Sequence, residues 1–404
     1  MKNVILFLLV FNIFFVFNVQ HFNAEEIKIA KNSKSAIIIE ESTGKILYES
    51  NAHEKRAMAS MTKIMTMLLI MENLDKGNIK LTDEVYISKN ASGMGGSQIF
   101  IEEGDYITVE DLLKGIAVGS ANDASVAMAE YIGGTEENFV SMMNKKAKNL
   151  GLVNTNFKNS HGLDEGEHYT TAYEMAIMAK ELLKYKEILK YTSIYEDYLI
   201  RDNGEKFWLV NTNKLIRFYK GIDGLKTGYT EKAGHCLTAT MEKNGMRVIT
   251  VVMESGSTEN RSSDTVSLME YAFSMYYANK ILKSEDVLGT VNIYKGVKDK
   301  IEYKVESDVK AILSKQDEEK GYSYEIELNK NITAPINKRD VLGKLTLYDE
   351  NKKIINEYNL ISNENVRKAS FFRMYINNLR KIAGGNLLTK WSVNASFLMW
   401  FYVI

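Results

Sequence analysis

The sequence predicts a mixed α/β (α+β) protein with a large N-terminal domain, a small all-β C-terminal domain and an amphipathic tail helix. Residues 60–185 contain several stretches of helical periodicity, and residues 209–253 contain strand-like apolar runs. Residues 280–362 contain only short alternating strands separated by polar turns. With 404 residues, of which 45% are hydrophobic, the chain is long enough to bury a large core.

The N-terminal half predicts one hairpin followed by helices. Two apolar runs flank the turn Ser42-Thr43-Gly44, which is a hairpin signal. A helix is expected after Thr108, because Thr108 can cap it and Asp111 stands at the capping-box position. The other segments with helical character are Ser60–Asn73, Asn122–Tyr131, Asn138–Leu150 and Thr171–Tyr185.

The C-terminal half turns to strands. Gly234–Met241 and Met246–Met253 flank a short polar turn, and the second run is apolar throughout, which predicts a central strand. A long helix is expected over Ser263–Tyr277. The short strands of the small β-domain are expected at Gly289–Tyr294, Ile301–Val305, Ala311–Leu313, Tyr322–Leu328, Lys344–Leu347 and Lys353–Ile361.

Composition excludes several classes of protein. The net charge is −1, whereas a dedicated nucleic-acid binder should carry a basic surface, so no nucleic-acid partner is expected. The one cysteine, Cys236, excludes an intrachain disulfide and a zinc site built on several cysteines. The charge is uneven, because residues 365–404 carry six basic groups and no acidic one. An acidic body with a basic tail predicts a tail that meets an anionic surface.

Both ends of the chain have sequence patterns that are typical of segments acting at a membrane. Lys2 precedes an almost wholly apolar run up to Val19, which predicts a signal peptide over residues 1–24, with an uncleaved anchor as the alternative. Residues 366–383 place aromatic and aliphatic residues at helical spacing between basic ones, which is typical of a helix lying at the membrane surface. The alternative is a tail that folds back onto the body.

Three short motifs carry the chemistry. In Ser60-Met61-Thr62-Lys63 the first and last side chains share a helix face, so the lysine can act as the base that a serine nucleophile needs. Ser120-Ala121-Asn122 precedes a helix, and Lys226-Thr227-Gly228 lies in a strand-like context. Each motif alone has an ordinary explanation, which is a capped helix, an N-cap or a strand end. Together and in this order they form the S-x-x-K, S-x-N and K-T-G set of the penicillin-interacting serine enzymes.

The chain resembles the serine-type D-alanyl-D-alanine carboxypeptidases, which are the low-molecular-mass penicillin-binding proteins. The resemblance includes the segments Ala59–Thr66, Ser120–Glu130, His161–Asp164 and Asp223–Thr230, and it spans about residues 30–362. It implies a β-lactamase/transpeptidase-like domain with an antiparallel sheet flanked by helices. The layout it implies is a signal peptide (1–24), a catalytic domain (25–279), a β-rich stalk (280–362) and a membrane anchor (363–404).

The resemblance implies a role for each matching residue. Ser60 would attack the carbonyl between two terminal D-alanines, Lys63 would be its base, and Ser120 would relay a proton to the leaving amine. The substrate-binding residues would be Asn122, Lys226, Thr227, Gly228, Tyr229 and Arg261. Among these, the N–H groups of Ser60 and Tyr229 would form the oxyanion hole, and Arg261 would bind a carboxylate.

The resemblance also implies partners and a location. The partners would be peptidoglycan stem peptides ending in D-Ala-D-Ala, β-lactam antibiotics and the membrane surface, at the outer face of the cytoplasmic membrane. Neither a cofactor nor a metal is expected, since His161 and His168 have no evident further ligands. The alternatives are a serine β-lactamase and a non-catalytic cell-wall or penicillin-binding protein. Departures from the family pattern at Met58, Ala121 and Tyr229 remove no reacting group.

Overall fold

The computed structural model describes residues 28–201, 204–316 and 321–375. The predicted signal peptide and the tail beyond residue 375 lie outside these described residues. The chain divides into two compact units. The first contains the described parts of Met1–Ile38, Leu47–Met241 and Ile249–Tyr271, and the second contains those of Ile39–Ile46, Glu242–Val248 and Ala272–Ile404.

A five-stranded sheet of order β2-β1-β9-β8-β7 forms the frame of the catalytic half. Its strands are β1 (Ser33–Glu40), β2 (Ile46–Ser50), β7 (Ile222–Thr230), β8 (Gly234–Lys243) and β9 (Met246–Ser255). Strand β9 is flanked on both sides and is buried along nearly its whole length, which confirms the central strand predicted from its apolar run. Both hairpins predicted here are confirmed as neighbouring strands.

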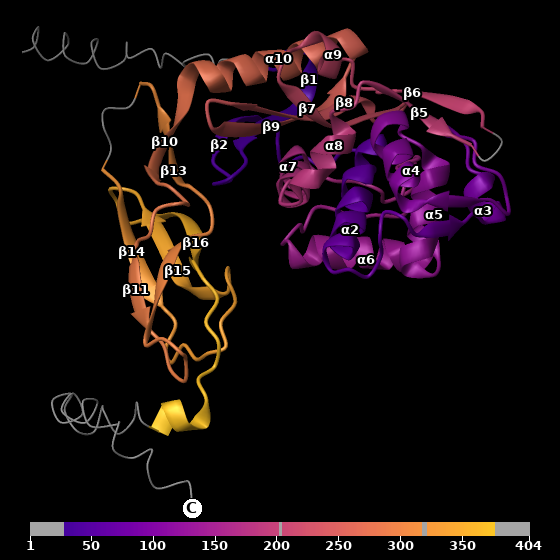
Figure 1. The fold of residues 1–404 in the computed structure, drawn as a ribbon. Coiled ribbons are helices and arrows are strands. Elements are labelled where there is room, and N and C mark those ends of the chain that lie inside the picture. Colours follow the sequence, from indigo (N-terminus) through magenta and orange to yellow (C-terminus); the bar gives the residue numbers. More distant parts are fainter. Residues whose placement is uncertain (1–27, 202–203, 317–320, 376–404) are drawn as a thin grey trace, which may run out of the picture. The chain divides into compact units, whose positions relative to one another are not determined.

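Helices cover both faces of this sheet. Figure 1 shows α10 (Thr258–Met275) along one face, with α2, α7 and α8 toward the other. The remaining helical segments are η1 (Ala59–Thr62), α2 (Lys63–Asp75), α3 (Lys89–Ser92), α4 (Val109–Lys114), η2 (Gly115–Gly119), α5 (Asn122–Gly133), α6 (Glu136–Asn149), α7 (Ala172–Leu182), η3 (Lys186–Ile188), α8 (Leu189–Thr192) and α9 (Leu215–Phe218). Among the described helices, none is both long and apolar enough to cross a membrane.

The predicted cap of α4 is confirmed. Thr108 Oγ1 accepts a hydrogen bond from the backbone N–H of Asp111 at 3.2 Å, which satisfies one of the free N–H groups of the first turn. Two short antiparallel pairs were not predicted, namely β3 (Glu84–Tyr86) with β4 (Tyr106–Thr108) and β5 (Glu196–Ile200) with β6 (Lys206–Val210). The first pair joins three-residue strands that are far apart in sequence and too short for a pattern of alternation to show.

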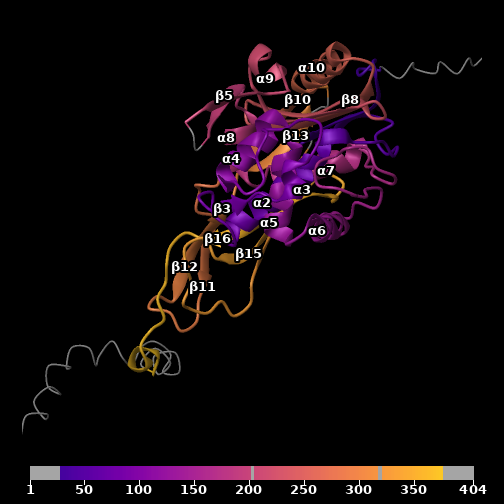
Figure 2. The ribbon, with the colours of Figure 1, turned by 90° about the vertical axis from the view of Figure 1, so that its right-hand side faces the viewer.

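The second unit contains the small all-β domain, as predicted. Its main sheet has the order β11-β12-β16-β15-β14, and β10 pairs with β13 in a separate ribbon. The strands are β10 (Tyr276–Leu282), β11 (Gly289–Asn292), β12 (Lys300–Val305), β13 (Val309–Ser314), β14 (Ser323–Leu328), β15 (Val341–Tyr348) and β16 (Ile354–Ser362). Figure 2 gives a second view of this domain, with the labels of β11, β12, β15 and β16.

The core of the β-domain reaches past its last strand. Leu345 and Leu347 of β15 and Leu360 of β16 are fully buried in it. Val366 belongs to the same core, and its backbone is paired with Ile336. Residues 371–375 are helical, but the prediction of helix over residues 366–370 is wrong, because the backbone of Val366 and Lys368 pairs with Ile336 and Gly296 of the β-domain. Residues 376–383 of the predicted tail helix lie outside the described residues.

Candidate active site

Ser60 lies on a tight turn rather than in the first turn of an α-helix. It belongs to the 3-10 segment η1, and α2 begins at Lys63. The residue before it, Ala59, has a φ of +47°, a left-handed conformation that costs on the order of 1–3 kcal/mol for a residue with a side chain. Strain of this kind at one residue next to a candidate nucleophile is typical of functional sites.

Lys63 is completely buried, which excludes the simple explanation of a solvated lysine. Its Nζ lies 3.1 Å from Ser60 Oγ, 2.7 Å from Asn122 Oδ1 and 2.6 Å from the carbonyl oxygen of His161. Burial lowers its pKa well below the usual value, the charge of Lys226 lowers it further, and Asp123 opposes the shift.

These contacts define which way the lysine lone pair points. A neutral amine has two N–H donors and one lone pair. The Asn122 oxygen and the His161 carbonyl can only accept, so they take the two N–H groups of neutral Lys63. The lone pair is then directed at the Ser60 hydroxyl. The lysine is therefore arranged to accept the serine proton.

The second motif is shaped by the active site and not by helix capping. Ser120 ends the π-helical segment η2 and has a φ of +60°. The N-cap of α5 is Ala121, which makes no side-chain cap. The Asn122 side chain binds Lys63 and also donates to the Gly95 carbonyl at 2.7 Å. The ordinary N-cap explanation is wrong here, because no side chain of the motif caps α5 and the Asn122 side chain binds Lys63 instead.

The third motif lies on β7 beside the same turn. An added Cβ at Gly228 would come within 2.8 Å of the Met58 carbonyl oxygen, so only glycine allows this close approach. Lys226 is almost fully buried, with its Nζ 3.1 Å from the Thr227 carbonyl. Burial and the nearby charge of Arg261 lower the pKa of Lys226 to about 7.

The remaining predicted binding residues surround this strand. Thr227 is buried, and its hydroxyl lies 2.6 Å from that of Thr212. Tyr229 is 58% exposed and stacks on His235 with ring centroids 4.5 Å apart. Arg261, on α10, is buried, and its Nε has no hydrogen-bond partner among the described residues. A buried N–H without a partner is costly unless a ligand completes it.

The segment 159–163 was not predicted to contact Lys63. Gly162 has a φ of +94°, and an added Cβ would lie 2.0 Å from the Ala59 carbonyl oxygen. The segment therefore packs directly against the Ser60 turn and supplies the His161 carbonyl to Lys63. The sequence offered a signal in His161-Gly162-Leu163-Asp164, but a backbone carbonyl ligand leaves no side-chain signature.

Three residues of types that often act in catalysis or metal binding, namely His168, Glu174 and Cys236, have structural surroundings instead. Both ring nitrogens of His168 are used, one by Thr62 Oγ1 at 2.7 Å and one by the N–H of Lys158 at 2.9 Å. The Glu174 carboxylate accepts from the N–H of Asn154 and lies at the start of α7. Cys236 is fully buried, and burial raises the pKa of its thiol to about 11, so it is an inert core residue.

Comparison with known proteins assigns both halves of the chain to families. Residues 20–257 match the family model described as D-alanyl-D-alanine carboxypeptidase, and residues 276–368 match penicillin-binding protein 5, C-terminal domain. The D-alanyl-D-alanine carboxypeptidase DacF of Bacillus subtilis (strain 168) is 49% identical over 344 residues, covering 85% of this chain and 88% of that protein. The D-alanyl-D-alanine carboxypeptidase DacA of Escherichia coli (strain K12) is 30% identical over 357 residues, covering 86% and 87%.

Solved structures agree with this assignment. Penicillin-binding protein 5 from Haemophilus influenzae has a TM-score of 0.64 at 31% identity, covering 83% of this chain and 98% of that chain. The ampicillin-bound form of penicillin-binding protein D2 from Listeria monocytogenes has a TM-score of 0.54 at 31% identity, covering 60% and 98%. The resemblance is confirmed, and so is the predicted fold class for the transpeptidase-like domain and the small β-domain. The chain belongs to the D-alanyl-D-alanine carboxypeptidases of the low-molecular-mass penicillin-binding protein family, which are penicillin-sensitive serine hydrolases.

Proposed function

We propose that the chain removes the terminal D-alanine from peptidoglycan stem peptides through an acyl-enzyme on Ser60. The observation that carries this proposal is the geometry at Lys63. A fully buried amine with a strongly lowered pKa has both of its neutral-form N–H groups engaged, and its lone pair is directed at a serine hydroxyl 3.1 Å away. A serine becomes an effective nucleophile when such a base takes its proton.

Acylation then proceeds through a tetrahedral intermediate. Ser60 Oγ attacks the carbonyl between the two D-alanines while Lys63 takes the hydroxyl proton, giving a tetrahedral oxyanion. The ammonium form of Lys63 now uses its third N–H toward Ser60. Ser120 gives its hydroxyl proton to the leaving amine as the C–N bond breaks and D-alanine departs, and the Lys63 ammonium reprotonates Ser120, which returns Lys63 to its neutral form. Water then attacks the ester carbonyl while neutral Lys63, through Ser120, takes a proton from it. The bond between Ser60 Oγ and the acyl carbon breaks, Ser60 Oγ takes the proton back, and the shortened peptide departs.

Backbone donors stabilise the developing charge. The N–H groups of Ser60 and Tyr229 form the oxyanion hole, and Gly228 lets β7 approach the Ser60 turn closely enough for the two donors to converge. Removing one such donor typically costs about 10²–10³ in rate. The Asn122 amide group orients Lys63 with its oxygen and also binds the substrate amide.

The substrate carboxylate meets a cationic wall. Lys226 with a pKa of about 7 is largely protonated below neutral pH, and the buried Arg261 has an Nε without a partner among the described residues. The Thr227 hydroxyl lies on the same strand. Charge-assisted hydrogen bonds to a carboxylate are stronger than neutral ones, which explains a preference for a free C-terminus.

We further propose where the enzyme works. Residues 1–24 act as a signal peptide for export. The part of the predicted anchor (363–404) beyond Ala369, whose backbone still pairs with the β-domain, holds the chain at the outer face of the cytoplasmic membrane through its basic amphipathic pattern. Residues 25–279 form the catalytic domain, and residues 280–362 form a stalk. β-Lactams acylate Ser60 as substrate mimics. The ampicillin-bound relative from Listeria supports this, since it shares the fold of the catalytic half.

The test is release of D-alanine from an N-acylated L-Lys-D-Ala-D-Ala peptide, measured together with labelling by a fluorescent penicillin. Both signals are expected in the native chain, and both disappear in Ser60→Ala while the thermal unfolding midpoint is kept. Failure to release D-alanine and failure to label Ser60 would refute the proposal. Rapid turnover of penicillin without a stable label would show a β-lactamase instead.

A further inference from the structure

Segment 159–163 supplies one of the two acceptors that orient Lys63, so whatever fixes this segment also orients the base. The His161 carbonyl lies 2.6 Å from Lys63 Nζ. Its own peptide group is held from the other side, because the N–H of Gly162 donates to Asn159 Oδ1 at 2.7 Å. This part of the chain is neither helix nor strand, so its position depends on side-chain contacts from other elements.

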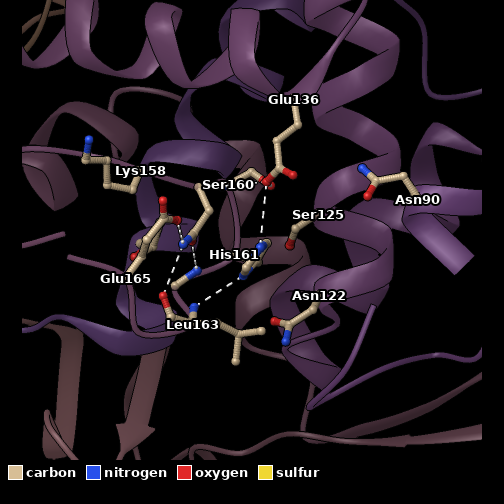
Figure 3. Close-up of polar contacts among 12 residues, drawn as sticks. Asn90, Asn122, Ser125, Glu136, Lys158, Ser160, His161, Leu163 and Glu165 are labelled. Atoms are coloured by element: carbon tan, nitrogen blue, oxygen red, sulfur yellow. Dashed lines mark hydrogen bonds and ion pairs between the residues drawn. The ribbon is translucent and has the colours of Figure 1, made fainter. Parts of the chain in front are cut away.

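One carboxylate from a distant helix holds the segment. Glu136, the first residue of α6, accepts from the Ser160 N–H at 3.0 Å and from the Ser160 hydroxyl at 2.7 Å, both through the same oxygen. That oxygen also lies 3.7 Å from His161 Nε2. Figure 3 shows Glu136 reaching down to Ser160 and His161. The Ser160 carbonyl is bound separately by Thr66 Oγ1 at 2.6 Å.

We propose that Glu136 is a positioning residue for the reaction, which sets the direction of the Lys63 lone pair by fixing the Ser160–His161 segment. This inference rests on the proposed role of Lys63 as the base. Glu136 makes no contact with Lys63, and its effect passes through two hydrogen bonds and one peptide unit. A matching amide oxygen would make the same two bonds, so the negative charge itself is not required.

The neighbouring residue provides a matched control. Glu137 occupies the same first turn of α6, carries the same charge and is exposed. Replacing it removes the same favourable charge from the helix N-terminus without touching Ser160. Comparing Glu136→Ala with Glu137→Ala therefore separates positioning of the segment from general stabilisation of α6.

The test measures kcat/KM for D-alanine release and the rate of penicillin acylation as functions of pH. Glu136→Ala is expected to lower kcat about 10- to 100-fold with little change in KM, since a misplacement of about 1 Å costs on this order. Glu136→Gln restores most of that loss, and Glu137→Ala leaves the rate unchanged. Ser160→Ala removes one of the two bonds to Glu136, and alanine fits this fully buried position, so a smaller fall in kcat is expected. In a chain that already carries Glu136→Ala, the Ser160→Ala substitution should cause no further fall.

The fall in rate on the acid side of the pH profile, the acid limb, reports the pKa of Lys63. A substitution that only lowered stability would not shift this limb. Loss of the His161 carbonyl removes an acceptor that favours the ammonium form of Lys63, so its pKa falls and the limb moves to lower pH. The charged groups that act on Lys63 are Lys226 on β7 and Asp123 on α5, and the substitution alters neither. His161 lies 3.7 Å from Glu136, but burial lowers the pKa of its ring to about 3, so it stays neutral with or without Glu136.

Three results would overturn the inference: an unchanged rate and acid limb in Glu136→Ala, an equal loss in Glu137→Ala, or no recovery in Glu136→Gln. If Glu136→Ala does not fold, Ser160→Ala provides the test, and its acid limb is expected to move to lower pH as well. Native enzyme that labels at Ser60 while the Glu136 variants behave normally refutes this inference alone. Absence of any label at Ser60 refutes the proposed function.

Discussion

Gly162→Ala tests whether segment 159–163 is built against the nucleophile turn. The backbone φ at Gly162 is +94°, where residues with a Cβ are strained, at a cost of about 1–3 kcal/mol. The new Cβ would also lie 2.0 Å from the Ala59 carbonyl oxygen and 2.8 Å from Thr62 Oγ1. Ordinary contact begins at 3.4 Å, so the segment or the turn must move by more than about 1 Å.

Either movement damages the site, because one partner carries the His161 carbonyl and the other carries Ser60. A shift of about 1 Å in catalytic geometry costs roughly 100-fold in rate. We therefore expect kcat/KM to fall at least about 100-fold and the free energy of unfolding to fall by about 2–4 kcal/mol. D-alanine release, penicillin acylation and urea denaturation measure these effects.

Gly166→Ala is the matched control from the same loop. No atom lies within 4 Å of the position that a Cβ at Gly166 would take, so this change is expected to alter activity and stability very little. Activity of Gly162→Ala within about fivefold of the native value, or an equal loss in Gly166→Ala, would show that the close approach does not constrain the nucleophile.

The other predictions concern charge and membrane attachment. Above about pH 7, kcat/KM should fall for a peptide with a free carboxylate as Lys226 loses its proton, but stay level for the C-terminal amide. Arg261→Leu should raise KM for the carboxylate peptide about 10- to 100-fold and move this alkaline limb to higher pH, because the Arg261 charge lowers the pKa of Lys226. A chain ending at Tyr375 should keep activity on soluble peptide and lose binding to anionic vesicles in sedimentation. Retained vesicle binding would refute the anchor.

The position of that truncation comes from the structure. Val366 and Ala369 are buried, and their backbone groups pair with Ile336 and Lys295 of the β-domain. A cut before residue 366 would expose part of the β-domain core, so loss of activity there would report unfolding and not loss of an anchor. The basic pattern of the tail gave no sign of this, because backbone pairing leaves no trace in composition.

The sequence predicted the reacting groups better than the groups that hold them. Ser60, Lys63 and Asn122 stand at fixed spacings within short motifs, and the structure brings their side chains together. Glu136 and Thr212 could not be found in this way. Each acts through one contact across many residues of sequence, and a first-turn acid or a loop threonine has an ordinary local explanation.

The fold shows the same division. The strands β8 and β9 and the β-domain were predictable because burial of one or both faces imposes a pattern on the sequence. The 3-10 turn at Ser60 and the left-handed residues Ala59 and Ser120 were not predictable, since their local preferences favour other conformations. These departures from local preference lie at the active site, where the surrounding tertiary structure must impose the geometry.

The two buried lysines explain how one pocket can hold both a base and an anion-binding group. Both lose solvation, which lowers both pKa values, and the charge on Lys226 lowers the pKa of Lys63 further. A substrate carboxylate beside Lys226 favours its charged form, and the charge on Lys226 contributes to the lowered pKa of Lys63. Lys226 therefore serves two roles, since its charge binds the substrate carboxylate and also favours the neutral form of Lys63 that accepts the serine proton.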